Sequence, residues 1–336
     1  MLTAIGFLAL GATGVLAGSP LVGRTAGALA ARAGLPGAPV RAVAVGIAGS
    51  LAATVIAAGR DLMPLGGAIP FGAIMFVVAA AFGAALLLGR RPSEVRDPVA
   101  LAAPAGGLLL VALMGADRAF VQSEGILLAL VFLPYLAWVA LGTRDPVVSP
   151  HPEPVPAEHD PAPTQPVPWW PETGPGPAAR EPEPTASSPA PAVWPLSGLA
   201  GAALVIGGAF AVVEGALRVA REAPLVPGFA GAAVAGTLTS LPFVLAVVSP
   251  RRPAAVRDPR APAGFVVVGL ATFVPGIAAV VRPFELDGPA TIALLGAAGL
   301  YAVAASWMLI RTRGGRVLGL VVLAAYAGVL WYAGSL

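Results

Sequence analysis

The chain has no cysteine, no lysine and few charged residues of any kind. Of its 336 residues, 57% are hydrophobic and only 11% are charged, and the mean hydropathy is +0.84. The absence of cysteine excludes disulfides, thiolate metal sites and cysteine nucleophiles. Soluble globular domains carry roughly 25% charged residues. The composition therefore indicates a protein whose solvent is lipid.

Charge is unevenly distributed along the chain, and this argues against a nucleic-acid partner despite a pI near 9.9. Segment 144–195 carries two arginines and seven acidic residues, a net charge of −5, whereas the whole chain carries +3. The other arginines lie mainly between apolar stretches, where membrane topology requires them. Positions 145–195 also contain 17 prolines and both histidines. We expect this connector to be extended or disordered.

Ten apolar stretches predict an all-α, polytopic membrane protein, since a spanning helix needs about 20 mostly apolar residues. The stretches are 2–22, 40–58, 65–88, 99–115, 125–141, 196–219, 226–248, 264–281, 290–310 and 317–334. They predict a five-helix unit at 1–143, a connector at 144–195 and a second five-helix unit at 196–336. We interpret the first stretch as a span and not a signal peptide, because no basic residue precedes Arg24.

The distribution of arginine predicts the orientation of these spans. With the N-terminus outside, 15 arginines fall on the cytoplasmic side and five on the outer side. Basic residues favour the cytoplasmic side, so we expect both termini outside and the connector in the cytoplasm. Because each unit has an odd number of spans, the two units are inverted relative to each other. The use of arginine without lysine, with abundant alanine, glycine and proline, suggests a bacterial plasma-membrane protein.

Four of the expected spans, the second, third, seventh and eighth, are short or interrupted by glycine and proline. Interrupted spans at matching places in two halves are the best sequence indication of a transporter's central site. Gly46 and the pair Gly66–Gly67 are the expected breaks. The Gly14–Gly18 and Gly23–Gly27 spacings permit close approach of helices.

Several motifs resemble the cation/calcium antiporter superfamily, of the sodium/calcium exchanger type. Segments 43–51 and 233–241 match each other in the spacing of glycine, serine and leucine, and Thr239-Ser240-Leu241-Pro242 reproduces four residues of the family's Gly-Thr-Ser-Leu-Pro-Glu signature. Weaker similarities lie at 18–22, 61–67, 96–98 and 124–125. The resemblance implies inverted repeats and alternating access at their interface.

The chain departs from this family where ions bind. The family's two ion-binding glutamates fall on Ala53 and Phe243, and no acid occurs in the second, third, seventh or eighth span. Calcium prefers six to eight oxygen ligands including carboxylates. The polar side chains left at the inferred centre are Ser50, Thr54, Thr237, Thr239, Ser240 and Thr272. They can hold a weakly bound monovalent ion or form interhelical hydrogen bonds.

Glu214 is the one acid inside an apolar stretch. An intramembrane carboxylate is a candidate for a proton relay. Its position four residues before Arg218 equally predicts a helical ion pair near the outer end of the span. Asp61 and Asp117, which adjoin Arg60 and Arg118, are expected to be caps or surface pairs.

These features predict a secondary transporter of a small cation across the lipid bilayer, with sodium or protons preferred over calcium. Two alternatives remain. One is a transport-inactive membrane scaffold that keeps the antiporter fold, and the other is a permease for an uncharged solute. No phosphate-binding loop or nucleophile–base pair is recognisable, so we do not expect an enzyme. We also expect no cofactor, no metal centre and no nucleic-acid partner.

Overall fold

The protein is a multi-pass bundle of apolar helices, and the computed structural model describes residues 1–87, 98–142, 194–248, 260–310 and 315–335. Within these residues, eight helical segments are long and apolar enough to cross a membrane. Two shorter apolar helices cover Ala102–Asp117 and Gln122–Trp138. They correspond to the fourth and fifth expected spans, and the count of ten spans stays a prediction. Both histidines and residues 144–193 of the connector lie outside the described residues, whereas Trp194 and Pro195 begin α8.

The elements follow the expected stretches in order. Those of the first half are α1 (Leu2–Arg32), α2 (Gly37–Gly59), α3 (Met63–Gly66), α4 (Ile69–Val78), the π-helix η1 (Ala79–Ala84), α5 (Ala85–Leu87), α6 (Pro98–Met114), the 3₁₀ turn η2 (Gly115–Asp117), β1 (Ala119–Phe120) and α7 (Gln122–Gly142). Those of the second half are α8 (Trp194–Glu222), α9 (Pro227–Ala230), the π-helix η3 (Gly231–Gly236), α10 (Thr237–Val248), α11 (Arg260–Val268), the π-helix η4 (Gly269–Phe273), α12 (Val274–Val281), β2 (Phe284–Glu285), α13 (Gly288–Ile310) and α14 (Gly315–Gly334).

One of the four spans expected to be interrupted is broken, and two others are continuous but contain a π turn. The third breaks between α3 and α4 at Gly67, as the glycine pair predicted, and contains η1, while the seventh and eighth contain η3 and η4. The expectation of a break in the second span was wrong, since α2 is one continuous helix through Gly46. A Cβ at Gly46 would collide with the Val266 side chain of α11. This glycine therefore serves close packing and does not break the helix.

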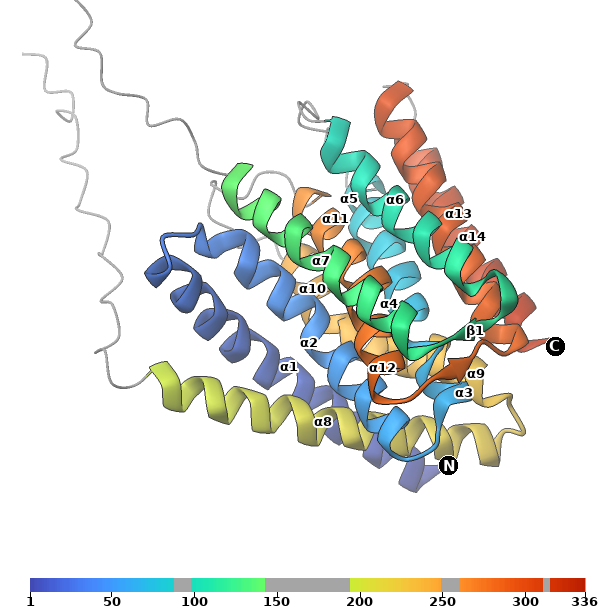
Figure 1. The fold of residues 1–336 in the computed structure, drawn as a ribbon. Helices are drawn as coiled ribbons and strands as arrows, with labels where there is room; N and C mark the ends of the chain where they lie inside the picture. Colours follow the sequence, from blue (N-terminus) through green and yellow to red (C-terminus); the bar gives the residue numbers. More distant parts are fainter. Residues whose placement is uncertain (88–97, 143–193, 249–259, 311–314, 336) are drawn as a thin grey trace, which may run out of the picture.

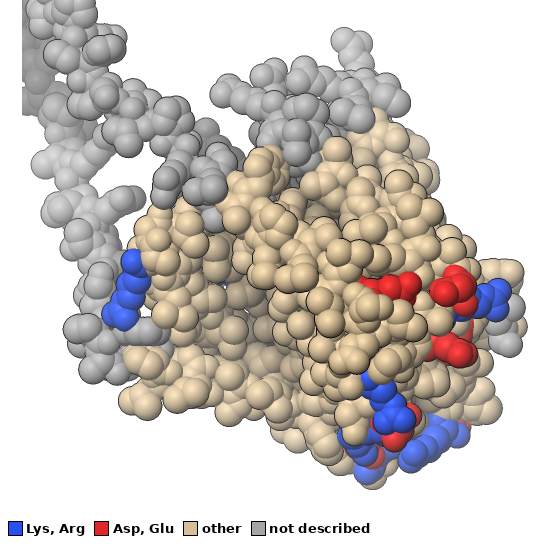
Figure 2. Space-filling model, viewed as in Figure 1, with Lys and Arg blue, Asp and Glu red and all other residues tan. Residues whose placement is uncertain are grey.

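The ion pairs of the structure gather at one end of the bundle, which we call the paired end. Both chain termini lie there, and the helix ends that flank the undescribed segments lie toward the other end (Figure 1). Figure 2 shows acidic and basic atoms together at the paired end, with few charged atoms elsewhere on that face. All acidic side chains that the structure describes belong to the paired end: Asp61, Asp117, Glu124, Glu214, Glu222, Glu285 and Asp287.

Helices α1 and α8 form an antiparallel pair along almost their whole length. A Cβ at Gly14 would lie 2.9 Å from the Gly208 Cα, and one at Gly18 would lie 2.6 Å from the Gly201 carbonyl oxygen. The predicted close approach through glycine is thus confirmed. Both helices exceed the roughly 20 residues that span the hydrocarbon core, so they are long enough to cross it at a tilt. Figure 1 shows α8 strongly inclined to α13 and α14.

Among the residues that the structure describes, the one departure from an all-α fold is a two-stranded sheet at the paired end. β1 pairs antiparallel with β2, with Ala119 opposite Glu285. The rings of Phe120 and Phe284 stack with centroids 5.2 Å apart. This sheet ties the segment before α7 to the segment before α13, and so joins the two halves.

Candidate functional site

The crossing of α2 and α10 brings together two of the predicted site residues from opposite halves of the chain. Ser50 Oγ lies 2.9 Å from Thr239 Oγ1, and both side chains are fully buried. The approach depends on Gly49, because a Cβ there would lie 2.6 Å from the Thr239 carbonyl oxygen. The alignment of segments 43–51 and 233–241 thus identified two stretches that meet in space.

The hydroxyl protons of Thr239 and Ser240 are directed along their own span. Thr239 Oγ1 donates to the Ala235 carbonyl at 2.8 Å, and Ser240 Oγ donates to the Gly236 carbonyl at 2.7 Å. A hydroxyl has one proton and two acceptor lone pairs, so in this arrangement Ser50 donates to Thr239. The lone pairs that remain on the Thr239 and Ser240 hydroxyl oxygens can coordinate a small cation.

The crossing adjoins unusual backbone. The π-helix η3 ends at Gly236, immediately before Thr237, and η4 contains Thr272. π-Helices are rare and occur mostly as single turns at functional sites. A Cβ at Gly236 would lie 2.7 Å from the Ile69 carbonyl oxygen of α4. The seventh span therefore packs against the third through backbone contact, and the centre of the bundle is close-packed.

The remaining predicted hydroxyls are not part of this contact. Thr237 bonds to the Tyr326 hydroxyl of α14 at 3.1 Å, and Thr272 donates to the Val268 carbonyl of its own helix at 2.8 Å. Thr54 is fully buried, and its Oγ1 has no hydrogen-bond partner within the described part of the chain. Ser19 of α1 shares both properties. Ser19 lies in segment 18–22, which resembles the antiporter family, but it was not among the predicted site residues.

The two positions that correspond to the family's glutamates are filled by apolar packing. Ala53 is fully buried in a small cluster with Leu65, Ile69 and residues of α8. Phe243 is 2% exposed and belongs to the main core of the bundle. Within the described residues, no three His, Cys, Asp or Glu side chains gather as metal ligands. Hydroxyls, and no carboxylates, are therefore the polar side chains of this centre.

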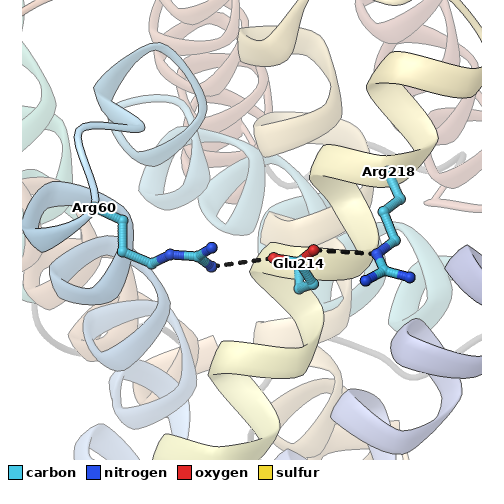
Figure 3. A network of polar contacts seen from close by, with 3 residues as sticks. All are labelled: Arg60, Glu214 and Arg218. Atoms are coloured by element: carbon cyan, nitrogen blue, oxygen red, sulfur yellow. Dashed lines mark hydrogen bonds and ion pairs between the residues drawn. The ribbon is translucent and has the colours of Figure 1, made fainter.

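Glu214 lies at the paired end and bridges two arginines (Figure 3). Its Oε1 lies 3.1 Å from Arg218 Nε, so the helical pair predicted from the spacing is present. Its Oε2 lies 3.2 Å from Arg60 Nη1, beyond the end of α2. This second partner is 154 residues away in the sequence, and no local pattern could have identified it. Glu214 does not lie at the Ser50–Thr239 crossing.

Asp61 and Asp117 act as predicted, as a surface pair and a cap. Asp61 forms an ion pair with Arg282 after α12, and Asp117 Oδ1 accepts from the Ala119 amide at 3.1 Å. Asp287 Oδ1 caps α13 by accepting from the Ala290 amide at 2.8 Å. Burial raises the pKa of the Asp287 carboxyl, opposed by its hydrogen bonds from the Ala290 and Gly228 amides.

A groove of about 500 Å³ lies away from this centre, between α13 and α14. Its lining is aliphatic apart from Tyr332, and none of the predicted site residues belongs to it. An apolar groove on the outside of a membrane bundle faces lipid tails. With Tyr332 as its one polar lining side chain, the groove offers no series of ligands for an ion pathway.

Solved structures of two exchangers share this fold. The H+/Ca2+ exchanger CAX superposes with a TM-score of 0.62 at 15% identity, covering 98% of this chain and 90% of that protein. The sodium–calcium exchanger NCX_Mj, soaked with sodium and strontium, gives a TM-score of 0.58 at 15% identity over 98% of both chains. No protein-family model and no curated protein sequence matches the chain. The chain therefore has a cation/calcium antiporter fold, as its motifs predicted.

Proposed function

We propose that the protein is a secondary transporter that exchanges a monovalent cation, sodium or a proton, by alternating access at the Ser50–Thr239 crossing. The observation that carries the proposal is this contact itself, in which buried hydroxyls from the two halves of the chain meet within an antiporter fold. Adjacent π-helices add backbone that is unusual for a purely structural helix.

The absence of carboxylates from the second, third, seventh and eighth spans favours a singly charged ion over a doubly charged one. Moving an ion out of water into an apolar interior costs tens of kcal/mol unless ligands compensate, and this cost grows with the square of the charge. Calcium binding normally recruits carboxylates among six to eight oxygens, and spans two, three, seven and eight contain none. Neutral hydroxyl and carbonyl oxygens suit a singly charged ion.

The proposed orientation places the paired end outside a bacterial plasma membrane. Both termini are then external, residues 1–143 and 196–336 form inverted repeats, and connector 144–195 is cytoplasmic. The arginine bias of the sequence supports this orientation. The lipid bilayer and a small cation are the partners that this proposal requires.

Flux through reconstituted protein tests the proposal. Ser50→Ala and Thr239→Val should each reduce gradient-driven sodium or proton flux in proteoliposomes at least tenfold. Thr13→Val is the matched control, because the Thr13 hydroxyl also bonds to a carbonyl four residues earlier but is exposed on α1. Flux in Ser50→Ala and Thr239→Val equal to that of the control would overturn the assignment of this site.

One observation favours a second function, a transport-inactive membrane scaffold. Ala53 and Phe243 fill the glutamate positions with well-packed apolar atoms. A scaffold should reconstitute as a folded protein and move no sodium, proton or calcium under any imposed gradient.

A further inference from the structure

The ion pairs of the paired end connect the two halves of the chain. Three of the four described pairs have one member before the connector and one after it, whereas the fourth, Glu214–Arg218, lies within α8. The three pairs are Met1 with Glu222, Arg60 with Glu214, and Asp61 with Arg282. Together with the β1–β2 pairing, they fasten the first half to the second at one end of the bundle.

Glu214 is the most enclosed member of these pairs, with a side chain that is 15% exposed. Its two arginines are held in turn by aromatic rings. Arg60 lies 5.0 Å from the centroid of the Phe210 ring, and Arg218 lies 4.2 Å from that of Phe7 on α1. Charged groups above aromatic faces are attracted by the ring quadrupole. The network therefore joins the end of α2 to α8 (Figure 3) and reaches α1 through the Phe7 ring.

The opposite end has no comparable network among the described residues. The charged side chains described there are all arginines: Arg24, Arg32, Arg41 and Arg316. Groups of one sign cannot pair with each other. Ionic contacts between the halves are therefore confined, within the described chain, to the paired end.

We propose that the Arg60–Glu214–Arg218 network is a latch that keeps the paired end closed. For the central crossing to open toward this side, α8 must separate from the end of α2, and Glu214 must leave Arg60. The partly enclosed pair is desolvated when closed, and water solvates both groups once it opens. The hydration free energy gained on opening offsets the loss of the ion pair, so the latch opens and closes reversibly. The inference rests on the proposed alternating-access function.

The absence of cysteine allows a direct test by thiol labelling. Thr54→Cys places a thiol on α2 one helical turn from Ser50 toward the paired end, at a side chain that is fully buried. In otherwise native full-length protein, it should react slowly with a membrane-impermeant maleimide applied at the paired end. Adding Glu214→Gln or Arg60→Gln should raise the labelling rate about tenfold, which corresponds to about 1.4 kcal/mol in the closed–open equilibrium.

Arg221→Gln is the matched control, since Arg221 is exposed on the last turn of α8 and in no ion pair within the described residues. It should leave the labelling rate unchanged. The double variant Arg60→Gln/Glu214→Gln should label no faster than the faster single variant, because each residue acts through the other. Circular dichroism and a monodisperse elution profile establish that each variant is folded.

Labelling in Glu214→Gln at the parental rate, or an equal rise in Arg221→Gln, would overturn the latch. Fully additive effects in the double variant would also overturn it. Flux measured on the same variants without Thr54→Cys separates the two proposals. Faster labelling without any cation flux supports the latch and overturns the transport function. Cation flux with an unchanged labelling rate supports the transport function and overturns the latch.

Discussion

Adjacent glycines on α8 face different surroundings, and this makes the α1–α8 interface testable by a matched pair of substitutions. A Cβ at Gly208 would lie 2.7 Å from the Val15 amide nitrogen and 2.8 Å from the Gly11 carbonyl oxygen. A Cβ at Gly207 would meet nothing within 4 Å. Both substitutions to alanine change the same helix by the same methyl group.

The two substitutions should move stability in opposite directions. Ordinary Cβ contacts begin at 3.4 Å, so Gly208→Ala requires α1 to retreat by about 0.5–0.7 Å, and such overpacking costs about 1–3 kcal/mol. Gly207→Ala should gain about 0.5–1 kcal/mol from helix propensity. The difference in unfolding free energy is then about 1.5–4 kcal/mol.

Thermal unfolding of the purified full-length protein in one detergent measures this difference. One kcal/mol shifts Tm by roughly 2–4 °C in domains of 150–250 residues and by less in longer chains. We expect Gly208→Ala to unfold about 2–10 °C below Gly207→Ala. If Gly208→Ala unfolded at or above the Tm of Gly207→Ala, the glycine-mediated packing of α1 on α8 would be refuted.

Three further predictions concern the acids, the hydroxyls and the missing glutamates. Because burial raises the pKa of Asp287, the folded state binds more protons than the unfolded state just above the ordinary aspartate pKa of about 3.9. The stability of the parent relative to Asp287→Asn, which keeps the cap, should therefore fall as pH rises through that window in a series of melting curves. Ser50→Ala should lower the unfolding free energy by about 1 kcal/mol through loss of one buried hydrogen bond, whereas an unchanged Tm would contradict the contact. Ala53→Glu should destabilise the protein by about 3–5 kcal/mol by placing an unpaired carboxylate in an apolar cluster, and sodium or calcium should restore part of the lost Tm if a cation site lies beside it.

Much of the fold could be predicted from the sequence, because hydropathy and arginine distribution determine where spans begin and end. Helices α1 and α8 were expected to be shorter than they are. Arg24 was assigned to a loop, yet the helix continues to Arg32. A long arginine side chain can extend to the membrane interface from within a helix. The three π-helices also escaped prediction, since residue periodicity does not distinguish a single π turn from an α turn.

The site was predictable only in part. The repeated Gly-x-x-x-Ser-Leu spacing identified Ser50 and Ser240, and the resemblance to antiporters added Thr239. The partners of Thr237 and Glu214 were not predictable, because Tyr326 and Arg60 are distant in sequence and only the packing of the bundle brings them near. Local spacing identified the Glu214–Arg218 pair because it lies within one helix.

The central claim is that hydroxyls have taken the place of carboxylates at the centre of an antiporter fold. Measuring which ion the protein transports tests this claim most directly. Uptake of radioactive sodium and of radioactive calcium can be compared in proteoliposomes from one preparation, under matched outward sodium and proton gradients. The account predicts saturable sodium uptake driven by the gradient, and calcium uptake no greater than in protein-free vesicles. Gradient-driven calcium uptake, or no monovalent cation flux from folded protein, would contradict it.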